Sequence, residues 1–501
     1  MGDSSSCANW IGKYNCVEIY CSDFEEITWD EALGMAIPTT ATPSSISALP
    51  MISMGHLPQF TTRKNDFVKP VKNYKVLEFF GKNIVTLEGE EWRRHKRVVA
   101  KSFGEKSIKL VWGESVRQAE GMIRIWGGRG KSSENGDEEL RVEDAGSDTA
   151  TLSLHVICAV GFGVPQLWEG EGEADVDNES LKIEGEEAPN LGLSKPAGEH
   201  SLGFKDCINL VFSSILLILI WPQWMLKISP IKRHGQVYKA FKETNQYVAG
   251  LLEHKKKQMS AGEYDKVTMD LMGNMLKAST ETSDSPTEIK SNAFIFLLAG
   301  HETTGSSIQL CFVYLAISIL SQTSMQADID LIVGSKKPRD WTYTRDFPRL
   351  YNSMMDCRES GRGRRDDIWD ENEDEDEDLV TDEMDSESSP LFKPVKGAFI
   401  SFSEGPRACP GKKFAQVEMI AVLTVIFQKY SVELDVSRWA SDEEVQSMND
   451  EERREVYGKA IRETKEVLGR CNQAQIVLKM AKGDKVPLRF VERGKERFRG
   501  L

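Results

Sequence analysis

Residues 402–411 read FSEGPRACPG and lead directly into residues 412–430, KKFAQVEMIAVLTVIFQKY, a pattern typical of an amphipathic helix. Cys409 therefore lies just before a helix N-terminus. There, unpaired backbone N–H groups and the positive end of the helix dipole favour the thiolate, which is the form that binds metals. Gly405 permits a tight turn, and Gly411 allows a flat group to approach the backbone. The alternative is a buried free cysteine in an ordinary turn.

Arg407, two residues before the sulfur, is a fixed cation suited to a carboxylate. The order of Phe402, Gly405, Arg407, Cys409 and Gly411 resembles the F-x-x-G-x-R-x-C-x-G signature of cytochrome P450. The resemblance implies a haem cofactor (heme, iron protoporphyrin IX) with Cys409 as the axial thiolate ligand of the iron. It also implies that Arg407 meets a haem propionate and that Phe402 packs against the cysteine loop.

The clearest helical pattern runs from residue 286 to about residue 320. Ser285-Pro286-Thr287-Glu288 provides a capping box with proline at the first helical position. The residues that follow are apolar nearly all round, which is typical of a helix through the middle of a core. We therefore expect a long buried helix here.

The centre of that helix is polar: Ala299-Gly300-His301-Glu302-Thr303-Thr304. It resembles the A-G-x-E-T-T oxygen-binding motif of cytochrome P450. Two small residues, Ala299 and Gly300, would let the helix approach a flat cofactor, and the resemblance implies that Thr303 and Glu302 organise proton delivery to bound O₂. The alternative is a helix kink whose hydroxyl groups bond back to carbonyl groups.

A basic helix is predicted from near Gly89, and Trp92-Arg93-Arg94-His95-Lys96-Arg97 resembles the family's W-x-x-x-R helix, whose Trp and Arg touch a haem propionate. Trp92 and Lys96 take these two positions, and Arg97 competes with Lys96. A lysine gives up the bidentate fork of arginine. Arg93 and Arg94 are either a solvated helix face or a docking patch for an acidic reductase.

One part of the family pattern is missing. The E-x-x-R helix should follow Met355, but only Glu359-Ser360-Gly361-Arg362 fits, and its interior glycine disfavours a helix. We interpret this match as spurious. Fifty positions separate Glu359 from Cys409, fewer than the family uses, and an acidic tract stands where strands and the meander belong.

Charge is concentrated in that tract. The chain has 501 residues and a formal charge of −15, and residues 366–387 hold 14 Asp or Glu and no Lys or Arg. Outside the tract the chain is nearly neutral, so a nucleic-acid partner is not expected. Nine cysteines without a CxxC pair exclude a disulfide framework or a structural zinc site.

We predict a mainly α fold with small β elements, the cytochrome P450 fold, in four segments. They are an irregular lead-in (1–65), a helical region (66–355), an acidic low-complexity segment (356–390), and the haem-thiolate loop with its helix and a C-terminal hairpin (391–501). Finer expectations are a helix over 144–160, loops over 127–140 and 169–190, two helices within 205–257 broken at Trp221-Pro222, a charged helix over 440–470, and a hairpin of 475–480 with 486–491.

The resemblance implies a monooxygenase, an iron-dependent oxidoreductase that uses O₂ and electrons from NADPH–cytochrome P450 reductase to oxidise a lipophilic substrate, as a monomer. Two alternatives stay open: a non-catalytic remnant that binds haem poorly, and isomerase-type haem chemistry. We expect no N-terminal membrane anchor, and the resemblance implies a place on the cytoplasmic side of the endoplasmic reticulum, peripherally at most. The apolar run 208–221 is short for a membrane span and is either a buried helix or a membrane-dipping segment.

Overall fold

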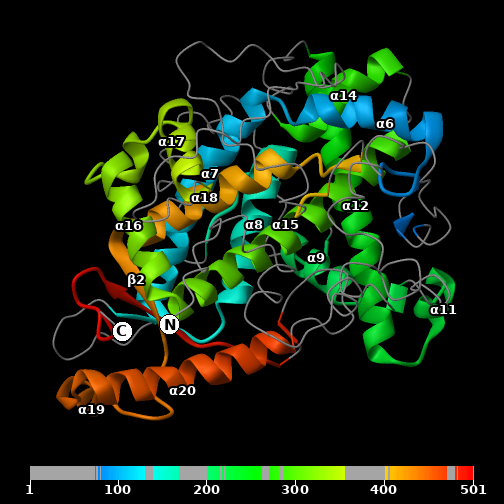
Figure 1. The fold of residues 1–501 in the computed structure, drawn as a ribbon. Coiled ribbons are helices and arrows are strands. Elements are labelled where there is room, and N and C mark those ends of the chain that lie inside the picture. Colours follow the sequence, from blue (N-terminus) through cyan, green and yellow to red (C-terminus); the bar gives the residue numbers. More distant parts are fainter. Residues whose placement is uncertain are drawn as a thin grey trace, which may run out of the picture.

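The computed structural model describes residues 74, 77–78, 81–129, 139–168, 200–214, 217–218, 221–261, 270–282, 286–355, 401–403, 407–470, 480–481 and 483–499. This part of the chain is mainly helical, as predicted (Figure 1). Its first helices are α6 (Gly89–Ser102), α7 (Glu105–Arg129), α8 (Ala145–Phe162), α9 (Phe204–Ser213), α11 (Gln223–Ile228), α12 (Lys232–Ser260) and α14 (Leu271–Thr282). The later helices are α15 (Pro286–Ile317), α16 (Ile319–Ile332), the 3₁₀ turn η4 (Pro338–Asp340), α17 (Tyr343–Met355), α18 (Lys412–Lys429), α19 (Asp442–Ser447) and α20 (Asp450–Gly469). The strands are β1 (Leu140–Val142), β2 (Tyr430–Leu434) and β3 (Leu488–Glu492).

Helices α7, α8, α15 and α18 pack together at the centre of the molecule (Figure 1). The tightest contact in this bundle is between α8 and α15, where glycine is required. A Cβ on Gly305 would lie 2.7 Å from the Cα of Ala150, and a Cβ on Gly146 would lie 2.6 Å from the side-chain amide of Gln309. Because backbone meets backbone at Gly305, any larger residue would force the two helices apart.

Helix α18 is present where predicted, but it is not amphipathic. From Phe414 to Phe427 its residues are buried on every side, including Glu418 and Thr424. The reason is its place in the fold: α7, α15, α16 and α17 all pack against it. A helix that is apolar all round is the pattern of a core helix.

Helix α15 is also present where predicted, and it ends at Ile317, three residues before the expected end. Ser318 separates it from α16, and the two helices meet at a bend of 111°. In the part of the chain that the structure describes, no single helix is long and apolar enough to cross a bilayer, and only this bent pair passes that test, by length and composition together.

A small antiparallel sheet has the strand order β1-β3-β2. Phe490 of β3 pairs with Leu140 of β1 on one side and with Val432 of β2 on the other. The strand predicted at 486–491 therefore exists, but its described partners are strands distant in sequence. The other half of the expected hairpin, 475–479, lies outside the described residues.

Three other expectations need adjustment. The predicted loop at 127–140 begins later, because α7 continues to Arg129, three residues past the buried Trp126. The charged helix at 440–470 is two helices, α19 and α20, since Asn449 caps a new helix with its own capping box. The break at Trp221-Pro222 is confirmed, and a second one at residues 229–231 separates α11 from α12.

Glu418 lies in the middle of α18 and is 1% exposed. Burial raises the pKa of Glu418 to about 8, against the opposing effect of the nearby Ser153 hydroxyl. At pH 7 the carboxyl group is therefore held mainly in its neutral form, because the charged form would lose its hydration. The core consequently contains a group whose ionisation opposes folding.

This burial predicts a specific pH dependence of stability. The ordinary glutamate pKa is 4.5, so between that value and about 8 the unfolded chain releases the proton before the folded chain does. The stability that depends on the neutral Glu418 carboxyl group is therefore fully present below pH 4.5 and is lost as the pH rises toward 8. Relative to Glu418→Gln, which cannot ionise, we expect the wild type to lose up to roughly 5 kcal/mol over this window. Urea unfolding of both proteins at a series of pH values measures the difference, and parallel curves would contradict the prediction.

Candidate functional site

The cysteine loop closes on itself ahead of α18. The backbone N–H of Cys409 donates to the carbonyl oxygen of Phe402 over 2.8 Å, so the two residues lie together as predicted. Ser403 supports the turn with a positive φ of 59°, which is uncommon for a residue other than glycine. Gly411 is the N-cap of α18, and a Cβ there would lie 3.8 Å from the sulfur of Cys409. Gly405 lies outside the described residues.

Cys409 differs from the other cysteines that the structure describes. Cys158, Cys207 and Cys311 are buried free thiols, whereas Cys409 is exposed. Cys409 is therefore the one of these four described cysteines that reaches the surface.

The protonation state of Cys409 corrects one expectation. Burial of the sulfur among the loop atoms raises the pKa of the Cys409 thiol even though the residue reaches solvent, and the backbone N–H of Gly411 only partly offsets this. The helix N-terminus therefore does not by itself produce a thiolate. A coordinated metal ion would, because coordination deprotonates a thiol outright.

Arg407 is held on three sides. Its Nη2 donates to the carbonyl oxygen of Leu87 over 2.8 Å and forms an ion pair with the carboxylate of Glu88. Its guanidinium lies over the ring of Trp92, 4.3 Å from the ring centre. Burial lowers the pKa of Arg407, and the charge of Glu88 opposes that shift. The carboxylate partner expected for Arg407 is thus supplied, in this structure, by the chain itself.

The basic helix, α6, meets the cysteine loop through Trp92. Lys96 lies 5.5 Å from the centre of the same ring, so Trp92, Lys96 and Arg407 form one cluster. Arg97 is exposed and has no contact with that ring in the described part of the chain. Of the two residues that compete for the second position of the motif, Lys96 is the one beside Trp92 in the described structure.

Arg93 and Arg94, which the sequence treats alike, have different surroundings. Arg93 is exposed and pairs with Glu90 on its own helix. Arg94 is half-buried, and its Nη2 lies 2.6 Å from the carboxylate of Glu288 at the start of α15. Arg94 is therefore not available as a docking residue. Glu288 binds across to α6 as well as standing at the predicted capping-box position.

His95 is a residue that the sequence analysis missed. It is 1% exposed, and its Nδ1 lies 3.0 Å from the side-chain nitrogen of Asn292. The Asn292 oxygen accepts from the backbone N–H of Ile84, so Asn292 must donate to His95, and the His95 proton is on Nε2, facing Glu288. Burial lowers the pKa of His95, which keeps it neutral. The sequence did carry a signal for its burial: His95 is three residues from both Trp92 and Val98, so the three share one face of the helix.

The polar centre of α15 has one exposed face. Ala299 and Thr303, one turn apart, are exposed on a helix that is otherwise largely buried. The hydroxyl of Thr303 donates to the carbonyl oxygen of Ala299 over 2.5 Å, and the helix runs on without a break. The back-bonding alternative is thus the arrangement in this structure, but without the kink.

Gly300 and His301, between Ala299 and Thr303 in the sequence, do not lie on this exposed face. A Cβ on Gly300 would lie 3.4 Å from Ile157 on α8, so Gly300 serves the contact between helices and not the exposed face. His301 is buried, with its Nδ1 2.7 Å from the carbonyl oxygen of Leu297. Glu302 is partly exposed beside Thr303. Of the two small residues in the motif, only Ala299 lies where a cofactor could approach.

Phe103, directly after α6, connects α15 to the cysteine loop. Its ring lies 5.4 Å from that of Phe296, one turn before Ala299 on α15. It lies 6.5 Å from the ring of Phe414 on α18 and would be 3.9 Å from a Cβ on Gly411. Residues from three distant parts of the sequence therefore meet around one aromatic ring.

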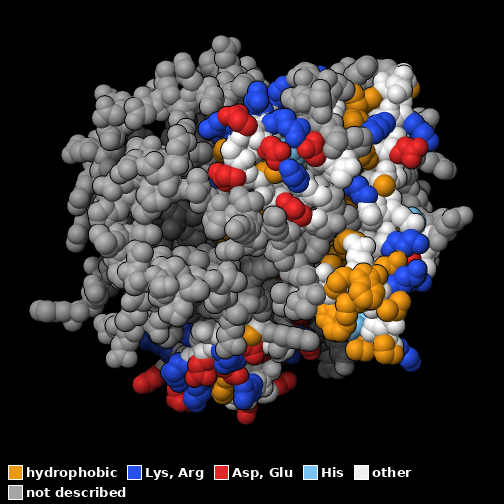
Figure 2. Space-filling model, turned by 90° about the vertical axis from the view of Figure 1, so that its right-hand side faces the viewer, with side chains coloured by type: hydrophobic (Ala, Val, Ile, Leu, Met, Phe, Trp, Pro, Cys, Tyr) orange, Lys and Arg blue, Asp and Glu red, His pale blue; other side chains and the backbone are white. Residues whose placement is uncertain are grey.

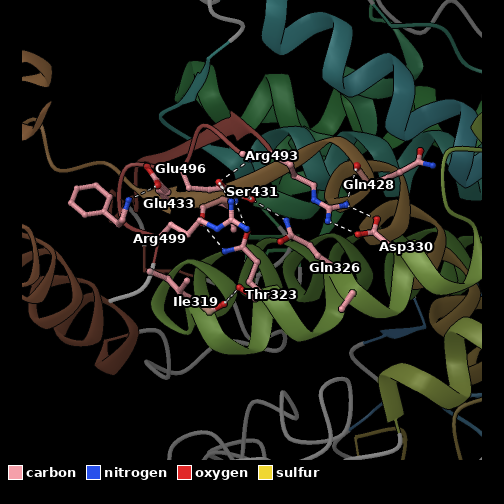
Figure 3. Close-up of a pocket in the computed structure, with 15 residues that line it drawn as sticks. Ile319, Thr323, Gln326, Asp330, Gln428, Ser431, Glu433, Arg493, Glu496 and Arg499 are labelled. Atoms are coloured by element: carbon pink, nitrogen blue, oxygen red, sulfur yellow. Dashed lines mark hydrogen bonds and ion pairs between the residues drawn. The ribbon is translucent and has the colours of Figure 1, made fainter. Parts of the chain in front are cut away.

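A cavity of about 430 Å³ lies elsewhere, between α16 and the strands β2 and β3 (Figure 3). It is lined largely by polar side chains that pair with one another or with the backbone: Arg493 with Asp330 at 2.6 Å, and Gln326 with Ser431 at 3.0 Å. None of the predicted site residues lines it.

The family model of cytochrome P450 matches residues 58–351 and 387–456 of this chain. The chain belongs to the cytochrome P450 family. Two fungal relatives are Cytochrome P450 monooxygenase 124 of Postia placenta, 26% identical over 75% of this chain and 74% of that protein, and Cytochrome P450 monooxygenase AOL_s00215g278 of Arthrobotrys oligospora, 24% identical over 75% and 73%. The human cytochrome P450 4Z1 is 22% identical over 63% of this chain and 58% of that protein.

Membership makes this P450 a haem-thiolate monooxygenase, an oxidoreductase that uses O₂ and a redox partner. The residues present fit a haem. Cys409, an exposed residue, stands just before α18, Ala299 and Thr303 are exposed on α15, and Arg407 and Lys96 supply cations beside Trp92. The matched segments leave out residues 352–386, and the questionable Glu359 and Arg362 fall in that interval, outside the described residues.

Proposed function

We propose that this P450 oxidises a lipophilic organic substrate, as a monomer, with electrons from NADPH–cytochrome P450 reductase. The observation that carries the proposal is the position of Cys409, an exposed residue of the signature loop, which is joined through Phe103 to the exposed face of α15. When bound, the haem supplies the activation of O₂. Cys409 would bind the haem iron through its sulfur, and Phe402 and Gly411 hold the loop around Cys409.

The residues around the cofactor have separate roles in this proposal. Arg407 and Lys96, with Trp92 between them, bind the haem propionates. Ala299 leaves room for the cofactor beside α15. Thr303 and Glu302 hold and pass protons. In this structure the Thr303 hydroxyl donates to the carbonyl oxygen of Ala299, and by rotating about χ1 it can donate to the substrate O₂ instead.

The thiolate assignment has a direct spectroscopic test. Purified protein reduced under carbon monoxide should show the red-shifted Soret band that thiolate ligation produces. Cys409→Ala should abolish that shift, whereas Cys311→Ala, which removes a buried thiol on α15, should retain it. A shifted band that survives in Cys409→Ala would overturn the ligand assignment.

A second candidate function, a non-catalytic remnant, is favoured by one observation: the family match omits residues 352–386, where the E-x-x-R helix belongs. The same spectrum separates the two candidates. A chain that remains free of haem, or whose band lacks the shift, supports the remnant and contradicts the monooxygenase.

The Thr303 role predicts a loss of coupling. In Thr303→Ala the hydroxyl is gone, so with reductase, NADPH and a fatty acid such as laurate we expect roughly tenfold less product per NADPH consumed. The carbon monoxide spectrum should be unchanged, because Thr303 does not bind iron. Thr303→Ser keeps the hydroxyl and is the matched control. Unchanged coupling in Thr303→Ala would show that Thr303 passes no proton.

We also propose peripheral association with the endoplasmic reticulum membrane through α11. Trp224, Ile228 and Ile231 are 62%, 71% and 52% exposed, and we call these three residues the α11 patch. Figure 2 shows a group of hydrophobic side chains with basic ones beside it. In the sequence, the exposed Lys227 and Lys232 stand next to the residues of the α11 patch. Apolar side chains next to cations suit the headgroup region of an anionic membrane.

For the apolar run 208–221, the described residues favour the first of the two alternatives, a buried helix. Ile208, Val211 and Ile218 within it are buried, so its described part is core. The exposed apolar side chains follow it, at residues 224–231.

Vesicle binding tests the α11 patch. With vesicles of phosphatidylcholine and phosphatidylserine, Trp224→Ser combined with Ile228→Ser should weaken binding at least about tenfold, because two exposed apolar anchors are lost. The control is Leu320→Ser with Leu331→Ser on α16, side chains that are 80% and 77% exposed. Equal losses in both double variants would argue against a specific membrane site.

A further inference from the structure

Glu88 precedes the basic helix and occupies its N-cap position. N-cap side chains normally accept from the first free backbone N–H groups of a helix, but the Glu88 side chain makes no such bond. Its carboxylate instead forms the ion pair with Arg407, 319 residues further along the chain. Glu88 therefore gives up a local role for a contact with the cysteine loop.

The contacts of Arg407 leave one edge of its guanidinium group available. The carbonyl oxygen of Leu87 and the carboxylate of Glu88 both accept from Nη2, and the ring of Trp92 covers one face. Toward the residues that the structure describes, Nε and Nη1 make no hydrogen bond. A guanidinium group has five N–H donors in a rigid plane, so fixing Nη2 also fixes the direction of the others.

We propose that Glu88 is a positioning residue that holds Arg407 ready to bind a carboxylate group of haem. The clamp is made of three contacts: Leu87 and Glu88 on Nη2, and Trp92 on the face. Orientation before binding reduces the entropy lost when the cofactor arrives. Because the inference concerns the binding of haem, it rests on the proposed function.

Charge gives Glu88 a second, separable effect. Without a cofactor, the cluster holds two cations, Arg407 and Lys96, around Trp92, and one anion, Glu88. Replacing Glu88 with an uncharged residue leaves more positive charge beside the cofactor. Positive charge favours the reduced form of iron, so the reduction potential should rise.

The test is a double-mutant cycle on the full-length chain, titrated with haemin after the cofactor has been removed. Glu88→Ala should weaken haemin binding roughly tenfold, the effect expected for losing a charge-assisted hydrogen bond. In the Arg407→Ala background the same substitution should have no further effect, because Glu88 acts through Arg407. Glu88→Gln retains an acceptor oxygen for Nη2, so it should bind haemin nearly as the wild type does while raising the reduction potential.

Glu90→Gln is the matched control, since Glu90 lies two residues away and, among the described residues, pairs with Arg93 at the surface. It should change neither haemin affinity nor reduction potential. A tenfold loss for Glu88→Ala in both backgrounds, or tighter binding in that variant, would overturn the inference while leaving the function intact. A wild-type chain that binds no haemin would overturn both.

Discussion

The close crossing of α8 and α15 is the constraint on which the rest of the site depends. Gly305 brings the backbone of α15 against Ala150, and Gly300 packs on Ile157 of the same helix. With these two residues turned toward α8, the face that carries Ala299 and Thr303 is directed elsewhere, and it is this face that is exposed. The rotation of α15 about its own axis, and hence the side chains it offers to a cofactor, is therefore set by contacts on the far side of the helix. Phe103 then links that helix to the cysteine loop.

The local features of the fold and site could be predicted from the sequence, and the non-local ones could not. The loop around Cys409, the start of α6 and the long helix α15 follow from neighbouring residues, because caps, turns and apolar periodicity act over a few positions. The burial of α18 was missed, since the helices that cover it come from four other parts of the chain. Pairings such as Arg94 with Glu288 and His95 with Asn292 join residues nearly 200 positions apart, and no local pattern reports them. The side of α15 on which Gly300 lies depends in the same way on its partner helix.

Two clusters of charge show how a structural group differs from a binding group. Arg489 is 1% exposed and is surrounded by acids: Asp435 at 3.1 Å, Asp442 at 2.6 Å and Glu139 at 3.0 Å. This cluster fastens β3 to neighbouring segments, and the three carboxylates that pair with Arg489 all come from the chain itself. The Arg407 cluster is smaller and more open, with two cations, one carboxylate and an aromatic face. A buried charge needs all its partners from the chain, whereas a binding charge keeps some of its donors for the ligand.

The glycines at the α8 crossing also bear on how such a scaffold can evolve. The side of α15 that meets α8 admits almost no substitution, since a single added methyl group at Gly305 would meet backbone atoms. The opposite side has no such restriction, because Ala299 and Thr303 are exposed. Selection can therefore vary the residues that face a small molecule while the helix keeps its position, and the two sides of one helix can change at different rates.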